Sequence, residues 1–157
     1  EGPVYIRLGR PKVPVLFDAN YQFEIGKGVV LRDGSDVTLM ATGIMVSKAV
    51  EAAEQLAAEG ISAAVVNIST IKPLDHALII QMAQKTGAVV TCEEHNIYGG
   101  LGSAVAEVLV EHCPVPMVRV GVEDKFGESG LPDQLLEKHG LTADNIAAKA
   151  KEVIGRK

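Results

Sequence analysis

Several features that often reveal a protein's function are scarce in this sequence of 157 residues. Tryptophan is absent, and the chain has only three tyrosines and three phenylalanines. Basic residues do not predominate, because 20 acidic residues outnumber 15 lysines and arginines and give a net charge of -5. A nucleic-acid-binding surface needs clustered basic residues. The composition therefore argues against a nucleic-acid partner.

Long apolar runs and patterned cysteines are lacking as well. No uninterrupted apolar run approaches the roughly 20 residues of a membrane helix, and no signal-peptide pattern begins the sequence. We therefore expect no membrane partner and a cytoplasmic location. The two cysteines, Cys92 and Cys113, lie in or beside apolar segments without metal-type spacing, which predicts two buried free thiols.

The first 20 residues differ from the rest of the chain. Residues 1–10 predict a strand with Val4, Ile6 and Leu8 on one face, and Pro11 and Pro14 predict an extended linker. A strand with no partner strand close behind it, in a sequence without an initiator methionine, suggests a piece of a longer protein. We place the domain boundary so that residues 1–20 and 21–157 are separate units.

From residue 25 onward, short apolar strands alternate with helical patterns. Strands are predicted over 28–31, 37–42, 63–68, the run that begins at 89, and 116–122. Helices are predicted over 46–56, 75–87, 104–112 and twice in the tail. Asp75 and Thr142 are the expected N-caps of two of these helices, and Gly87 is an expected helix end. Such alternation implies a largely parallel sheet covered on both faces. The tight turn at Asp33-Gly34 predicts that strand 28–31 runs antiparallel to the next strand. The expected fold class is α/β: a three-layer α/β/α domain whose mostly parallel mixed sheet carries one antiparallel edge strand.

The stretch from Val89 to Ser103 is the main candidate for a functional site. Glu93, Glu94 and His95 fall where a parallel strand would end, which is the edge where ligands usually bind. Gly100, Gly102 and Ser103 then lead into a helix whose free N–H groups would suit a phosphate or carboxylate.

Two observations favour another interpretation of this stretch. Adjacent glutamates would repel the same anion, and Gly99-Gly100-Leu101-Gly102 matches the dinucleotide fingerprint only loosely. In that interpretation the glycines allow a tight strand-to-helix turn, and the glutamates and histidine contact a neighbouring domain. Glu93, Glu94, His95, Gly100, Gly102 and Ser103 are thus candidates for an interdomain contact or an anion site.

No residue of the chain is predicted to be catalytic or to bind a metal. Ser103 lacks the G-x-S-x-G pattern of a hydrolase, and no H-E-x-x-H spacing occurs. Arg10 is different, because it follows the apolar face of the first predicted strand and could grip a phosphate with two hydrogen bonds. Spacing alone is equally compatible with a solvated arginine at a domain edge.

Four segments together resemble the C-terminal part of transketolases, including those encoded as two separate subunits. They are G-P-V-Y-I-R-L-G-R, F-E-I-G-K-G, E-E-H-N-I-Y-G-G-L-G-S and G-V-E-D-K-F-G-E-S-G, in family order. The 1-deoxy-D-xylulose-5-phosphate synthases and the β chains of 2-oxoacid dehydrogenases share this domain. F-G-E-S-G resembles transketolase better than a β chain, whereas G-L-P-D also fits the synthase.

The resemblance implies an enzyme that uses thiamine diphosphate and Mg²⁺ to transfer a two-carbon ketol unit between sugar phosphates. Residues 1–20 would be the last strand of an upstream pyrimidine-binding domain plus a linker, and residues 21–157 the transketolase C-terminal domain. Arg10 matches the family arginine that contacts the substrate phosphate. The implied partners are the upstream diphosphate- and pyrimidine-binding domains, in a homodimer of the complete enzyme.

The family's cofactor motifs are missing from this chain. The sequence has no Asn-Asn pair, and Arg32-Asp33-Gly34 lacks the first glycine of the G-D-G that precedes that pair in the family. The glutamate that activates the cofactor lies upstream in the family. We therefore expect this chain to bind no cofactor and to be inactive by itself. A regulatory module that binds an anion or nucleotide at the turn from Gly99 to Ser103 is the alternative of a different class.

Overall fold

The protein forms a five-stranded mixed sheet between two layers of helices, as seen in a computed structural model that describes residues 2–9 and 12–157. The strand order is β1-β3-β2-β4-β5, and β1 alone runs antiparallel to its neighbour. The strands are β1 (Val29–Arg32), β2 (Val37–Ala41), β3 (Ala63–Asn67), β4 (Val89–Asn96) and β5 (Met117–Val122). The helices are α1 (Met45–Ala58), α2 (His76–Thr86), α3 (Leu101–His112), α4 (Pro132–Lys138) and α5 (Ala143–Ile154).

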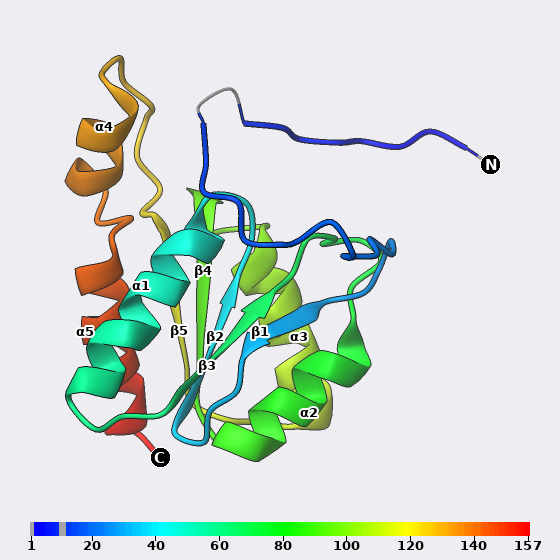
Figure 1. The fold of residues 1–157 in the computed structure, drawn as a ribbon, viewed down its shortest axis with the longest axis vertical. Coiled ribbons are helices and arrows are strands. Elements are labelled where there is room, and N and C mark those ends of the chain that lie inside the picture. The colour runs from blue at the N-terminus through cyan, green and yellow to red at the C-terminus, as the bar shows by residue number, and fades with distance from the viewer. Residues whose placement is uncertain (1, 10–11) are drawn as a thin grey trace.

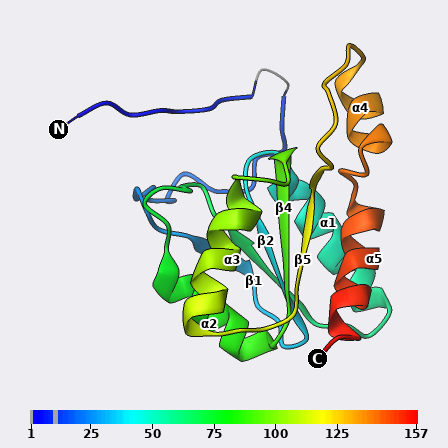
Figure 2. The ribbon, with the colours of Figure 1, turned by 180° about the vertical axis from the view of Figure 1, so that it is seen from behind.

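Each face of the sheet has its own apolar core. Helices α1 and α5 cover one face, and α2 and α3 cover the other (Figures 1 and 2). The central strands β2 and β3 are buried along their whole length, so they read as continuous apolar runs and not as alternating ones. The expected three-layer α/β/α class is confirmed.

Several helix ends lie where the sequence predicts them. Asp75 caps α2 by accepting a hydrogen bond from the backbone N–H of Leu78, and Gly87 ends that helix in a left-handed conformation. Thr142 caps α5 in the same way as Asp75, through the N–H of Asn145. These ends are predictable because capping depends on a few local side chains.

The partner of β1 differs from the prediction. The turn at Asp33-Gly34 predicts a hairpin with β2, yet β1 pairs with β3, with Val29 opposite Asn67 and Val30 opposite Val66. Strand β2 is instead flanked on both sides by parallel strands, β3 and β4. The turn sequence indicates a reversal of the chain, but it does not determine which strand is alongside.

The strand predicted over residues 1–10 is not formed in residues 2–9, the part of it that the structure describes. Residues 2–9 adopt no regular structure, and the side chains of Val4, Ile6 and Leu8 are all exposed. In Figure 1 this segment runs away from the body of the domain. Apolar alternation predicts a strand only where a neighbouring strand completes the hydrogen bonds.

Two further expectations concern the cysteines and membrane association. Cys92 is fully buried in the core, whereas Cys113 is only partly buried, so the prediction of two buried free thiols holds fully for Cys92 alone. Within the described residues, no helix has the length and apolar character that crossing a membrane requires.

Candidate functional site

Glu93 is a buried carboxylate that closes the start of α3. Its side chain is only 2% exposed, and its two oxygens accept hydrogen bonds from the backbone N–H groups of Leu101 and Gly102 at 2.7 and 2.8 Å. A carboxylate at a helix N-terminus is stabilised by these donors and by the helix dipole. The expectation of free N–H groups is therefore wrong at Leu101 and Gly102.

The glycines of the turn have different structural roles, and Gly100 makes room for this carboxylate. A Cβ atom at Gly100 would overlap the side chain of Glu93, and one at Gly102 would lie 2.8 Å from the Cδ of Arg119. Gly99 has a φ of +74°, a left-handed conformation that glycine adopts without strain. These glycines thus serve a close approach of strand and helix. Because Glu93 caps the helix, α3 begins at Leu101, three residues before the predicted start.

Glu94, the next residue of β4, is half-exposed and contacts the N-terminal segment. The guanidinium of Arg7 donates one hydrogen bond to the backbone carbonyl of Glu94 at 2.9 Å and another to its carboxylate at 3.1 Å. Sequence reasoning assigned Arg7 no role. The sequence shows an arginine in the N-terminal segment and two adjacent glutamates at the end of β4. Their spacing along the chain does not indicate that they meet.

His95 and the residues after it form a turn that is fixed by its own polar contacts. The Nδ1 of His95 lies 2.9 Å from the carbonyl oxygen of Asn96. Asn96 donates to the carboxylate of Asp124 and accepts from the N–H of Tyr98. Ser103 accepts from the N–H of Gly99 at 2.9 Å. The predicted site residues Glu93, Glu94, His95, Gly102 and Ser103 thus have hydrogen-bond partners within the strand-to-helix turn or in the N-terminal segment.

Tyr98 and Arg119 cover the outside of the same turn. Arg119 donates to the carbonyl of Ile97 at 2.9 Å, and its guanidinium carbon lies 5.5 Å from the centre of the Tyr98 ring. Tyr98 is nevertheless 59% exposed. An exposed aromatic ring on a fixed turn is typical of a contact surface for another domain.

The proposed phosphate ligand Arg10 lies outside the described residues. The structure therefore does not place its side chain near any other group, and its role stays a prediction.

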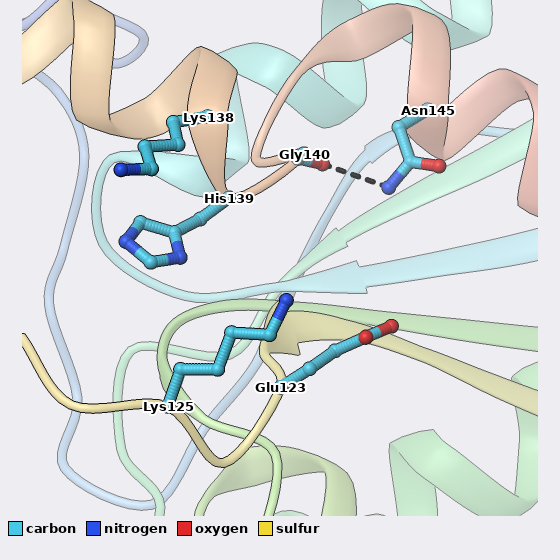
Figure 3. A pocket seen from close by; sticks show the side chains of 6 residues that line it. All are labelled: Glu123, Lys125, Lys138, His139, Gly140 and Asn145. Carbon is cyan, nitrogen blue, oxygen red and sulfur yellow. Dashed lines mark hydrogen bonds between the residues drawn. The ribbon is translucent and has the colours of Figure 1, made fainter.

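A separate surface pocket of about 260 Å³ lies between the loop after β5, the end of α4 and the start of α5. Its lining includes Lys125, Lys138, His139 and Glu123, whose side chains are seen in Figure 3. Lys138 is paired with Glu128 at 2.6 Å and lowers the pKa of that carboxyl, so its charge is already compensated.

The described residues do not fit a metal or diphosphate site. No three His, Cys, Asp or Glu side chains come together in residues 2–9 and 12–157. The N–H groups of Leu101 and Gly102, which would otherwise suit a diphosphate, are bonded to Glu93.

The fold and the closed turn define a class of protein: an α/β/α domain with an apolar core on each face of its sheet. The family model for the transketolase C-terminal domain matches residues 26–146. The chain therefore belongs to the transketolase family, as a C-terminal domain of that family.

Two relatives and a solved structure agree with this family. The 6-deoxy-6-sulfo-D-fructose transketolase subunit SqwH of Clostridium sp. (strain MSTE9) is 55% identical over 100% of this chain and 49% of the relative. A 1-deoxy-D-xylulose-5-phosphate synthase of Heliobacterium modesticaldum is 48% identical over 98% of this chain and 24% of the relative.

The solved structure is a split gene transketolase described as an inactive β4 tetramer. It is 56% identical, with a TM-score of 0.95 over 98% of this chain and 50% of that chain. The chain thus spans about half the length of the transketolase relatives and about a quarter of the synthase.

Proposed function

We propose that this chain is the C-terminal portion of a thiamine-diphosphate-dependent transketolase that moves a two-carbon ketol unit between sugar phosphates. The observation that carries the proposal is the joint match of the family model and of two transketolase relatives that are twice as long. In this proposal residues 1–20 end the pyrimidine-binding domain, and residues 21–157 form the C-terminal domain. Thiamine diphosphate and Mg²⁺ bind to the upstream domains.

The role proposed for this chain is structural. It packs against the upstream diphosphate- and pyrimidine-binding domains and completes a homodimer of the whole enzyme, and it is inactive alone. The closed start of α3 supports this role, because Glu93 leaves no vacant anion site at Leu101 and Gly102. The exposed Tyr98 and the apolar residues of segment 2–9 supply surface for such packing. A cytoplasmic location stays a prediction.

The synthase is the second candidate, because one relative of that activity is 48% identical. The two activities are distinguished by their products. We expect the complete enzyme to transfer a ketol unit from xylulose 5-phosphate to an aldose phosphate and to form no 1-deoxy-D-xylulose 5-phosphate. Formation of the deoxy sugar without ketol transfer would instead establish the synthase.

A sulfonated ketose should also be tested as a ketol donor, beside xylulose 5-phosphate. SqwH is described as a 6-deoxy-6-sulfo-D-fructose transketolase subunit, and it is 55% identical to this chain over 49% of its own length. A sulfonate and a phosphate are both tetrahedral anions that an arginine can hold through charge-assisted hydrogen bonds. Turnover of the sulfonated ketose at a lower KM than xylulose 5-phosphate would identify it as the preferred donor.

A regulatory anion module is the remaining alternative. Isothermal titration calorimetry of this chain with nucleotides and sugar phosphates tests it. We expect no stoichiometric binding, because two of the N–H donors at the turn are occupied. Tight binding that is abolished by changes at Gly99 to Ser103 would favour the module.

A further inference from the structure

Adjacent residues at the carboxyl end of β4 have two different tasks. Side chains along β4 alternate between the two faces of the sheet. Val89 packs in the core under α2 and α3, and Val90 and Cys92 pack in the core under α1 and α5. Glu93 follows the first series and binds the start of α3. Glu94 follows the second series, and its carboxylate meets Arg7.

The backbone carbonyl of Glu94 is available to Arg7 because β2 ends before it. Pairing between β2 and β4 stops at Ala41 opposite Cys92, and the carbonyl of Cys92 accepts the N–H of Thr42 at 3.1 Å. The next carbonyl on the same side of β4 belongs to Glu94, where no residue of β2 remains. Arg7 donates to this carbonyl at 2.9 Å. One guanidinium thus satisfies a free strand carbonyl and a carboxylate together.

Within the described residues, these two hydrogen bonds are the ones that join segment 2–9 to the domain. The anchor on the domain side is held firmly, because the preceding Glu93 is buried and bonded twice. An arginine can reach both acceptors with its planar fork, whereas the single ammonium of a lysine cannot reproduce that geometry.

We propose that Arg7 and Glu94 form a latch that fixes segment 2–9 against the carboxyl end of β4, and that Arg7 is a positioning residue for the sugar-phosphate site. The second half of this inference rests on the proposed function, in which Arg10, three residues after Arg7 in the sequence, contacts the substrate phosphate. The latch itself rests only on the described contacts.

Limited proteolysis of this chain tests the latch directly. Trypsin cleaves after Arg7 and Lys12, and Pro11 blocks cleavage after Arg10, so fragments that begin at Leu8 or Val13 are distinguishable by mass. A guanidinium held by Glu94 is withheld from the protease. We expect Glu94→Gln to raise the initial ratio of the Leu8 fragment to the Val13 fragment about two- to fivefold, the range for a half-exposed ion pair.

Glu59→Gln is a matched control. Glu59 pairs with Lys151 at 2.9 Å across a similar sequence separation, and both pairs are about half exposed. This control should leave the fragment ratio unchanged. An unchanged ratio in Glu94→Gln would overturn the latch.

Kinetics of the complete enzyme test the positioning role. We expect Arg7→Lys and Glu94→Gln to raise the KM for xylulose 5-phosphate about two- to fivefold with kcat unchanged, and the Arg7→Glu, Glu94→Arg double variant to recover part of that loss. An unchanged KM, or a fall in kcat alone, would overturn positioning. If the wild-type enzyme transfers no ketol unit, the proposed function fails, while the proteolysis result still decides the latch.

Discussion

Glu93 shows how one buried charge can fix the start of a helix. The side chain leaves β4, enters space that a Cβ atom at Gly100 would occupy, and accepts hydrogen bonds from two N–H groups that would otherwise lack partners. A buried carboxylate is costly unless donors surround it. Of the two adjacent glutamates, Glu93 therefore has a structural role.

Replacing Glu93 by Gln should destabilise the domain substantially. The amide would present a donor to one of the two N–H groups, and hydrogen bonds to a charged group contribute about 1.5–3 kcal/mol each. We expect the free energy of unfolding, measured with urea, to fall by about 2–3 kcal/mol. Glu107→Gln, on the exposed face of α3, is the control and should change it by less than about 0.5 kcal/mol. Equal stability of the two variants would contradict the capping role.

Cys92 and Cys113 should differ in reactivity. Burial is the main cause that raises the pKa of the Cys92 thiol, and the nearby charge of Glu93 adds to it. At pH 8 we expect a thiol reagent to modify Cys113 at once and Cys92 only after unfolding. A Cys113→Ser variant should then react only in urea. Two thiols that react equally fast in the native protein would contradict the buried position of Cys92.

The same thiol predicts a pH dependence with a definite sign. Because folding raises the pKa of Cys92 above the value near 9.0 of a free thiol, its contribution to stability is complete below that pH. It is lost as the pH rises further, because the unfolded chain then releases a proton that the folded chain retains. Urea midpoints measured from pH 8 to 10 should fall more steeply in the wild type than in Cys92→Ala.

At the scale of elements, local signals predicted much of the fold. Asp75, Gly87 and Thr142 mark helix ends correctly because capping needs only neighbouring residues. The pairing of β1 with β3 was missed, since it joins residues far apart in sequence and depends on the whole sheet. The role of Glu93 was missed for the same reason: its partners lie eight and nine residues away, across a turn.

Asp75 links two elements and should matter more than an ordinary cap. One carboxylate oxygen accepts from Leu78 at the start of α2, and the other accepts from the N–H of Gly28 just before β1. We expect Asp75→Ala to lower the free energy of unfolding by about 1–2 kcal/mol. Asp75→Asn keeps one acceptor oxygen and should lose less. If Asp75→Ala and Asp75→Asn lower the free energy of unfolding by the same amount as Thr142→Ala, Asp75 acts only as a cap.

At the scale of the whole molecule, the domain has its own buried core but leaves several apolar side chains exposed. Segment 2–9, Tyr98 and the fully exposed Phe126 carry apolar surface that the described residues do not cover. The sequence predicted the class of fold and the family correctly. It could not assign Arg7, because the contact with Glu94 exists only when the two segments are placed in space.

Reconstitution tests the account's central claim most directly. The upstream part of the enzyme is assayed for ketol transfer from xylulose 5-phosphate with thiamine diphosphate and Mg²⁺, with and without this chain. We expect this chain alone to be inactive and the upstream part alone to have little activity, and their mixture to transfer the ketol unit. Full activity of the upstream part by itself, unchanged when this chain is added, would contradict the account.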